Sequence, residues 1–418
     1  MRRQRNRGAA LLLVIAVLAA LVAVVGLYAS VQAAAFRSAV QRVDGDQAQR
    51  MAEAGLARAL AILAEPATET TATTLQDPWA TLDSAGATQF LMGEGSFRLE
   101  VIDAASRINL NRASEADLIK LPLTTAQVAS LLDWREADLT ARPEGAKDDV
   151  YTNLDQPYNT ALGDLESIDE LFLVQGFGPE TLLAPPQQST TAPSLVAGGP
   201  EQQPALLELI TTDSASTRPA DDGQPRLNVN TANLPQLTQR GVPVVLAAAI
   251  IQRRNNVGTF TRLGDVLRTP GVNLTNATIL LDRLAVDAAT STVGLVNLNT
   301  ASEAVLNSLD GMTPDVAGAI LQRQSTGFTS LGSLTTVPGV TLDVLATVID
   351  RLAVDSTTFV VRVSGRHGRQ TRALEAIVVV EADGPRVIKR LTPLGDDAPT
   401  WWRWDAETTT TVDLGETQ

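Results

Sequence analysis

The chain contains no cysteine and a single histidine, His367, among its 418 residues. Without cysteine it can form neither a disulfide framework nor a thiol active site, and it lacks the Cys/His ligands of a zinc site. A nucleophilic triad that needs histidine would depend on His367 alone. This residue lies in the polar, glycine-containing segment 364–369, which is typical of an exposed hairpin turn. We find no catalytic constellation and expect no enzymatic activity.

Aromatic side chains and positive charge are also scarce. Aromatic residues make up 4% of the chain, and 33 Lys and Arg face 47 Asp and Glu, for a formal net charge of −14. An acidic protein repels nucleic acid and anionic lipid except at local basic patches. Few aromatic residues suit small helical units with modest cores. Since 418 residues exceed the usual size of one hydrophobic core, two or three domains are expected.

What the chain does have is an uncharged apolar segment, residues 9–35, which follows four arginines and Gly8. A membrane-spanning helix needs about 20 apolar residues, so this segment is long enough to cross a bilayer. The arginines before it predict that the amino terminus stays in the cytoplasm and that everything after Arg37 is exported. An ordinary signal peptide has a shorter apolar core and would be cut near Ala33 or Ala35. Three interpretations stay open: a leader cut before the apolar helix, an uncleaved anchor, and a signal peptide. The basic leader that ends at a glycine favours the first.

The helical pattern continues beyond the apolar segment. Apolar residues recur at steps of three to four as far as Leu63, and Pro66 ends the pattern. We therefore predict one helix over residues 9–65, the first half in the membrane and the second half packed on an exported domain. The Asp-Gly-Asp sequence at 44–46 is a possible break in it.

Strand signals occur near both ends of the exported part. Residues 95–103 alternate apolar and polar side chains, as a half-buried strand does. Residues 359–363 and 373–381 flank the glycine turn as a predicted strand pair.

Residues 185–204 are rich in Pro, Gln, Ser and Thr without helical period and predict a linker. The polar end of the chain, 405–418, is expected to be loose.

The main internal signal is a repeat that opens on Asn-x-Asn and occurs three times, at 109–111, 228–230 and 297–299. The second and third copies also match further on, down to a closing Asp-Arg-Leu-Ala-Val-Asp at 282–287 and 350–355. Asn, Ser and Thr near the opening can cap a helix, and Pro-Gly pairs set tight turns. Each copy therefore predicts two short helices around a turn.

The first copy differs because it carries an acidic, turn-rich insertion that runs to about Leu162. Its sequences are Asp-Trp-Arg-Glu-Ala-Asp at 133–138 and Glu-Gly-Ala-Lys-Asp-Asp-Val-Tyr at 144–151. Calcium binds six to eight oxygens from carboxylates and backbone carbonyls on a bent loop, and this segment offers both. The spacing is not that of an EF-hand. From the chemistry alone, a solvated acidic loop and a calcium site both stay open.

Several of these motifs resemble one family. The junction at Gly8 resembles a prepilin leader, and residues 49–57 resemble the second half of the long helix in pseudopilins. The Asn-x-Asn units resemble helix-hairpin-helix units of exported competence DNA receptors and minor pseudopilins. Asp-Trp-x-x-x-Asp followed by Gly-Ala-x-Asp-x-x-Tyr, and then residues 171–177, resemble a signature of the K-type minor pseudopilin of type II secretion.

This resemblance implies roles for particular residues. A prepilin peptidase would cut between Gly8 and Ala9, and the new amino terminus at Ala9 would be methylated. Most pilins carry a glutamate at the fifth mature position, thought to pair with the amino terminus of a neighbouring subunit, whereas this chain has Leu13. A buried acid in the membrane is costly unless it is paired. A subunit at the tip has no neighbour above it and can do without the acid, so Leu13 favours the tip.

The K-type protein is known as a calcium binder in its large helical domain. The resemblance therefore makes four carboxylates plausible calcium ligands: Asp133, Asp138, Asp148 and Asp149. Lys147 stands where an acidic residue is often found, which affects the charge of such a site.

Together these features predict an α+β fold, in which a long N-terminal transmembrane and pilin helix packs on a small antiparallel sheet, with a large, mostly helical insertion. The predicted segments are a leader (1–8), the membrane and stem helix (9–65), a β region (66–106), a helical domain with the acidic insertion (107–184), a linker (185–225), two helix-hairpin-helix repeats (226–290 and 291–356), a strand pair (357–392) and an acidic tail (393–418). The extra copy of the repeat departs from the family pattern.

The predicted function is that of a minor pseudopilin at the tip of a type II secretion pseudopilus, which starts or caps the fibre. It would be a single-pass protein of the bacterial inner membrane with its bulk in the periplasm. Its expected partners are other minor pseudopilins, the prepilin peptidase and secreted substrate.

The alternative is an anchored DNA receptor for uptake. Helix-hairpin-helix modules bind phosphate through the backbone of a Gly-x-Gly hairpin with nearby Lys or Arg. Here Gly241 and Gly311 fill the first position, but Pro243 and Thr313 fill the second, and proline has no N–H to donate. With so acidic a chain, packing and protein contact are favoured over nucleic acid binding.

Overall fold

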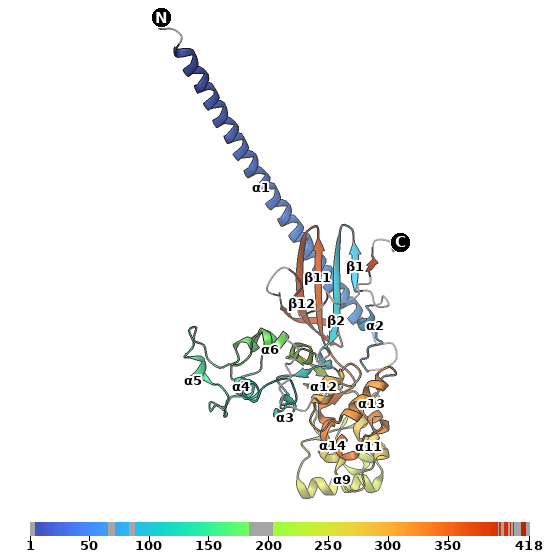
Figure 1. The fold of residues 1–418 in the computed structure, drawn as a ribbon. Coiled ribbons are helices and arrows are strands. Elements are labelled where there is room, and N and C mark those ends of the chain that lie inside the picture. Colours follow the sequence, from blue (N-terminus) through green and yellow to red (C-terminus); the bar gives the residue numbers. More distant parts are fainter. Residues whose placement is uncertain are drawn as a thin grey trace.

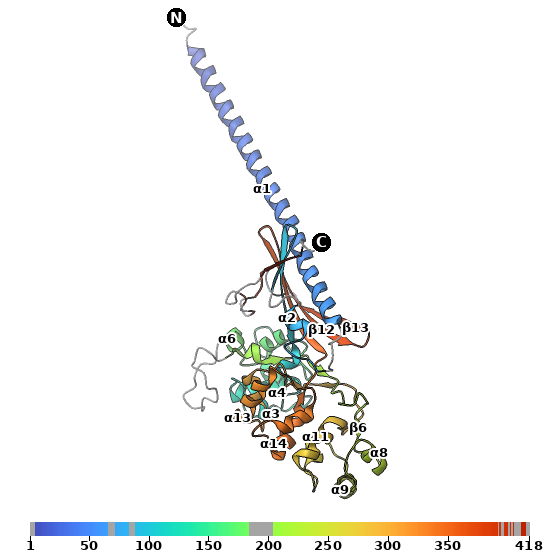
Figure 2. The same ribbon diagram turned by 90° about the vertical axis from the view of Figure 1, so that its right-hand side faces the viewer.

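The computed structural model describes residues 5–65, 72–82, 88–183 and 204–391, with positions 393, 397–399, 402, 404 and 411–414. The molecule is elongated. The helix α1 (Arg5–Ala64) enters from one end, a sheet lies along its second half, and the other helices gather at the far end (Figure 1). Figure 2 shows the same order from the side. The predicted α+β fold is confirmed.

α1 is one uninterrupted helix of 60 residues, about 90 Å long at ~1.5 Å per residue. It is long and apolar enough to cross a membrane, and its apolar half from Leu11 onward is exposed. The break predicted at 44–46 is wrong, because the helix continues through Gly45. A Cβ there would lie 3.1 Å from Arg372 Nη2, the end of a flexible side chain, and the glycine makes no turn.

The sheet has six strands in the order β13-β12-β11-β2-β1-β14, antiparallel except for the pair β1 and β14. The bounds are β1 Gln89–Met92, β2 Gly95–Asp103, β11 Thr358–His367, β12 Gln370–Glu381, β13 Gly384–Leu391 and β14 Thr411–Asp413. The strand predicted over 95–103 is confirmed. The predicted pair near the carboxyl end is in fact three strands. Within the end predicted to be loose, 405–418, residues 411–413 pair with β1, which corrects the prediction for these residues. Just before it, the side chains of Trp402 and Trp404 are buried.

α1 packs on the sheet through two glycines. A Cβ on Gly365 of β11 would lie 2.2 Å from both Ala48 O and Ala52 N of the helix backbone. A Cβ on Gly55 of α1 would lie 2.4 Å from Val363 Cγ1. Helix and sheet therefore touch almost backbone to backbone, and the core between them contains buried side chains such as Leu56 and Phe97.

Three helical units follow, each closed by a two-residue parallel bridge between its first and last strand. β3 (Ile108–Asn109) pairs with β4 (Ile210–Thr211), β6 (Leu227–Asn228) with β7 (Leu284–Ala285), and β9 (Val296–Asn297) with β10 (Leu352–Ala353). We call residues 107–212, 226–287 and 295–355 the first, second and third units.

Short helices fill the units. The first contains α3 Glu115–Leu118, α4 Thr125–Arg135, α5 Asp148–Tyr151, η2 Ile168–Leu173, α6 Pro179–Leu183 and α7 Leu206–Leu209. The second contains α8 Leu234–Gln239, α9 Val244–Val257, α10 Leu263–Leu267 and α11 Leu274–Arg283, and the third α12 Glu303–Ser308, α13 Pro314–Gln324, η4 Leu331–Thr336, α14 Leu342–Val348 and η5 Ile349–Arg351. The remaining elements are α2 Pro78–Thr81, η1 Ala104–Ser106, β5 Ala215–Ser216 and β8 Thr292–Val293.

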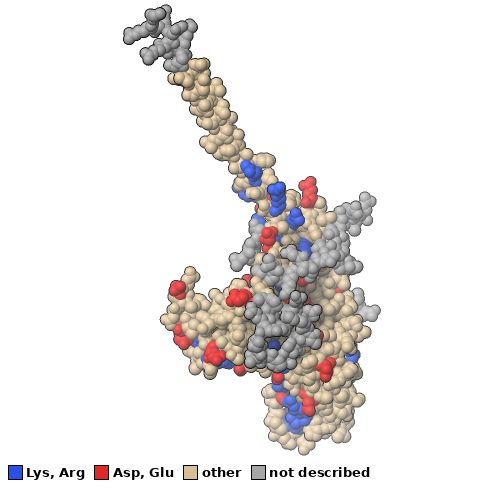
Figure 3. All heavy atoms as spheres, viewed as in Figure 1, with Lys and Arg blue, Asp and Glu red and all other residues tan. Residues whose placement is uncertain are grey.

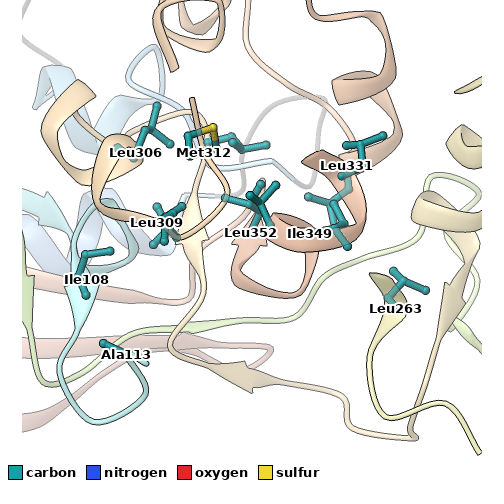
Figure 4. Packing of buried hydrophobic residues seen from close by; sticks show 14 of the residues in the cluster. Ile108, Ala113, Leu263, Leu306, Leu309, Met312, Leu331, Ile349 and Leu352 are labelled. Carbon is teal, nitrogen blue, oxygen red and sulfur yellow. The ribbon is translucent and has the colours of Figure 1, made fainter. Parts of the chain in front are cut away.

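The pairing of β3 with β4 corrects the predicted linker over 185–225. Residues 184–203 lie outside the described residues, but α7 and β4 complete the first unit, and Leu206, Leu209 and Ile210 are buried in its core. One hydrophobic cluster runs through all three units, and Figure 4 shows part of it.

Candidate functional site

The second asparagine of each Asn-x-Asn motif fastens its unit. In the third unit, Asn299 Oδ1 accepts from Phe328 N (2.6 Å), while its Nδ2 donates to Phe328 O (3.0 Å) and to Val354 O (3.1 Å). In the second unit, Asn230 makes the same bonds to Phe260 N, Phe260 O and Val286 O. Asn111 repeats them in the first unit, with Leu165 and Thr212. The motif is thus a clamp that ties the opening loop to the middle and the end of its unit.

The third unit is also joined to the sheet, through Asp103 at the end of β2. This buried carboxylate accepts from Ala105 N (2.8 Å), Asn297 Nδ2 (2.9 Å) and Thr300 Oγ1 (2.6 Å). Burial raises the pKa of Asp103, and the hydrogen bonds lower it in part. The first asparagine of the third motif therefore connects two domains.

The first unit contacts the hairpin of the third unit, which would be its phosphate-binding element. Asp310 N donates to Asp117 Oδ1 (2.8 Å), and Lys120 Nζ donates to Leu309 O (2.9 Å). Arg351 bonds both Asp117 and Asp310 O. These groups serve a contact within the chain.

The second and third units bind each other reciprocally. Asp350 of the third unit accepts from Leu263 N (2.7 Å) and Gly264 N (3.1 Å) at the start of α10. Asp282, its counterpart in the second unit, accepts from Gly332 N (2.5 Å) at the start of η4. Helix amino termini attract anions, and here the chain's own carboxylates occupy them. The two copies thus pack as a pseudo-twofold pair.

Two basic residues, one in the second unit's hairpin and one beside it, are likewise paired. Arg240 bonds Asp222 (2.7 Å), and Arg283 bonds Asp221 (2.8 Å), which lowers the pKa of that carboxyl. Beside them, Val244 and Val245 at the start of α9 are exposed.

On the face shown in Figure 3, Lys and Arg gather where α1 meets the body and at the distal end of the helical units, with Asp and Glu nearby.

The four predicted calcium ligands do not come together. Asp133, fully buried at the end of α4, accepts from Arg142 N (3.0 Å) and Arg142 Nη1 (2.9 Å). Asp138 accepts from Thr140 N (2.9 Å) and Asp148 from Thr160 N (2.7 Å), and these backbone bonds lower the pKa of both carboxyls. Asp149 is exposed. Among the described residues, no group of three or more His, Cys, Asp or Glu is placed to hold a metal ion, and calcium binding stays a prediction.

Two basic side chains that are not among the predicted site residues, those of Arg142 and Lys147, hold the insertion together. Arg142 bridges Asp133 and Glu136, with 2.6 Å from its Nη2 to Glu136 Oε2. Lys147 is 4% exposed and donates from Nζ to Asp133 O and, at 2.8 Å, to Glu136 O. Lys147 was visible in the sequence as a departure from the family pattern, whereas nothing in the sequence distinguished Arg142.

Trp134 and Tyr151 of the same signature form the core of the insertion together with Tyr158. Trp134 meets Tyr151 edge to face with ring centroids 5.2 Å apart, and Tyr151 stacks on Tyr158 at 5.3 Å. Trp134 Nε1 donates to Glu170 (2.8 Å). The signature therefore includes residues that pack the core of the insertion as well as carboxylates that could bind a metal ion.

The stem residues lie on α1. Gly8 and Ala9 are in its first turns, though their side chains lie outside those described, and Leu13 is 66% exposed on the bare apolar half. Cleavage and methylation stay predictions.

Comparisons with known proteins agree with the sequence resemblance. Residues 117–185 match the family model "Type II secretion system (T2SS), protein K", and residues 292–353 match "Helix-hairpin-helix motif". These two segments are thus similar to protein K and to a helix-hairpin-helix motif, and the predicted resemblance is confirmed for them.

Other similarities are more distant. The chain is 29% identical over 183 residues to endonuclease/exonuclease/phosphatase family domain-containing protein 1 of Rattus norvegicus, and 27% identical over 174 residues to that of Homo sapiens. Each match covers 40% of this chain and 26% of the relative, so the chain spans about a quarter of the length of these curated relatives. A solved structure of the GspK-GspI-GspJ complex from enterotoxigenic Escherichia coli is similar at a TM-score of 0.43 and 16% identity, over 86% of this chain and 100% of that one.

Proposed function

We propose that this chain is a minor pseudopilin of type II secretion, of the K type, with a structural rather than a catalytic role. The observation that carries the proposal is the match of residues 117–185 to protein K on a chain whose apolar helix runs without interruption into a sheet. A membrane helix continuous with a packed stem suits a subunit that is drawn from a membrane into a fibre. The single long apolar helix fits a single-pass anchor.

The position in the fibre is the tip, where the subunit starts or caps assembly. Leu13 supports this position, because an apolar fifth mature residue offers no acid to the amino terminus of a preceding subunit. The partners would be other minor pseudopilins, reached through α1 and a sheet edge, and a secreted protein at the distal units. The amino terminus would face the cytoplasm across the inner membrane, with the body in the periplasm.

Mass spectrometry of the protein purified from membranes tests this proposal. We expect a mature amino terminus at Ala9 carrying one methyl group, because the prepilin peptidase would cut after Gly8. The control is the same chain from cells without that peptidase, which should begin at Met1. An amino terminus at Met1 in peptidase-containing cells, or one near Phe36, would defeat the proposal.

The rival function is an anchored DNA receptor. The contacts argue against it, because the hairpin of the third unit meets Asp117 and the starts of α10 and η4 meet Asp350 and Asp282. We expect the full chain in detergent to bind duplex DNA no better at low salt than at high salt. Tight binding that weakens steeply as salt rises would establish the rival function.

A further inference from the structure

The acidic insertion is closed by a buried lysine. Lys147 Nζ lies at the carboxyl end of α4 and donates to the carbonyls of Asp133 and Glu136. The last carbonyls of a helix lack partners within it and carry the negative end of its dipole, so they attract a cation. An ammonium has three N–H donors and no acceptor, which suits two converging carbonyls.

A second basic side chain, that of Arg142, binds the carboxylates of Asp133 and Glu136. Arg142 occupies both oxygens of Asp133, one through its backbone N–H and one through its guanidinium, and it also bonds Glu136. The loop lies tight against this group, since a Cβ on Gly145 would be 2.0 Å from Asp133 Oδ2. Two acidic and two basic side chains thus balance in charge around the end of α4.

We propose that Lys147 and Arg142 take the place of a calcium ion, so that the insertion of this chain is held closed by its own cations and needs no divalent metal. Both carboxylate oxygens of Asp133 are already bonded, and a divalent ion would also be repelled by two nearby positive charges. The proposal rests on these contacts alone and holds whether or not the chain sits at a fibre tip.

Limited proteolysis of the full chain in detergent tests the proposal, with cleavage between residues 136 and 164 followed by mass spectrometry. Cleavage of a folded loop reports how often it opens. We expect equal rates in calcium chloride and in EGTA. Calcium that slows this cleavage by about fivefold or more would overturn the proposal, whatever the variants below do.

Variants test the role of the ammonium. Lys147→Met keeps most of the length of the side chain but removes its ammonium, so the carbonyls of Asp133 and Glu136 lose this donor. We expect cleavage at least about tenfold faster. Lys147→Glu places a carboxylate beside the same carbonyls, and we expect calcium to slow the cleavage of this variant. The matched control is Lys120→Met, which removes another lysine bonded to a backbone carbonyl but outside the insertion. A native rate for Lys147→Met would contradict the proposal.

Discussion

Replacing Gly365 with valine should release the stem helix from the sheet. The new Cβ would lie 2.2 Å from Ala48 O and Ala52 N, which are backbone atoms of α1 and cannot turn aside as a side chain can. β11 is held between β2 and β12 and cannot retreat either. Overpacking usually costs about 1–3 kcal/mol, and a clash between two backbones belongs at or above the upper end. We expect a loss of at least about 3 kcal/mol, or roughly 100-fold faster hydrogen exchange of the α1 amides over 48–63.

Substitutions at two further glycines provide comparisons for the Gly365 variant. Gly55→Ala meets only the side chains of Val363 and Phe97, which can adjust, so its effect should be smaller. Gly318→Val is the matched control, because nothing lies within 4 Å of a Cβ on that helical glycine. Unchanged exchange in the Gly365 variant, or a larger change in the Gly318 variant, would contradict the close packing of helix on sheet.

The second large effect is expected at the clamp of the third unit. Asn299 is fully buried, and Asn299→Ala would leave Phe328 N and Phe328 O without a partner, while Val354 O would keep only its bond from Thr73 N. Each unpaired buried group costs about 1–3 kcal/mol, so a loss of about 3–5 kcal/mol is expected. The measurement is hydrogen exchange over residues 295–355, compared with the native chain.

The repeat supplies the control for this prediction. Asn230 makes the corresponding three bonds in the second unit but is half-buried, so water can replace part of what alanine removes. Asn230→Ala should cost about half as much over residues 226–287. An equal or larger loss there would show that burial does not decide the strength of the clamp.

Local sequence patterns predicted the parts of this fold that depend on local order. The helical period of α1, the apolar and polar alternation in β2 and the duplication of the second and third units could all be recognised in the sequence. The pairing of β3 with β4 was not, because a two-residue bridge between positions about 100 residues apart has no period of its own. For the same reason β14 could not be placed on β1 from a polar tail.

The candidate site divides in the same way. Composition indicated where the acidic loop lies, and its aromatic residues do form the core of the insertion. Which cation satisfies Asp133 depends on where Arg142 and Lys147 come to lie after the loop has folded, and spacing cannot show that. Similarly, the missing second hairpin glycine favoured protein contact over phosphate binding, but it could not show that Asp117, far away in the chain, meets the third hairpin.

The absence of a joint in α1 gives the stem a mechanical property. Since the helix passes from its bare half into the sheet without a turn, a push or twist at the apolar end is carried to the body along one continuous helix. Each residue of the exposed stretch before Asp44 also sets the height of the body by about 1.5 Å and its azimuth by about 100°. The length of α1 therefore fixes both how far the three units lie from its apolar end and the direction in which they face.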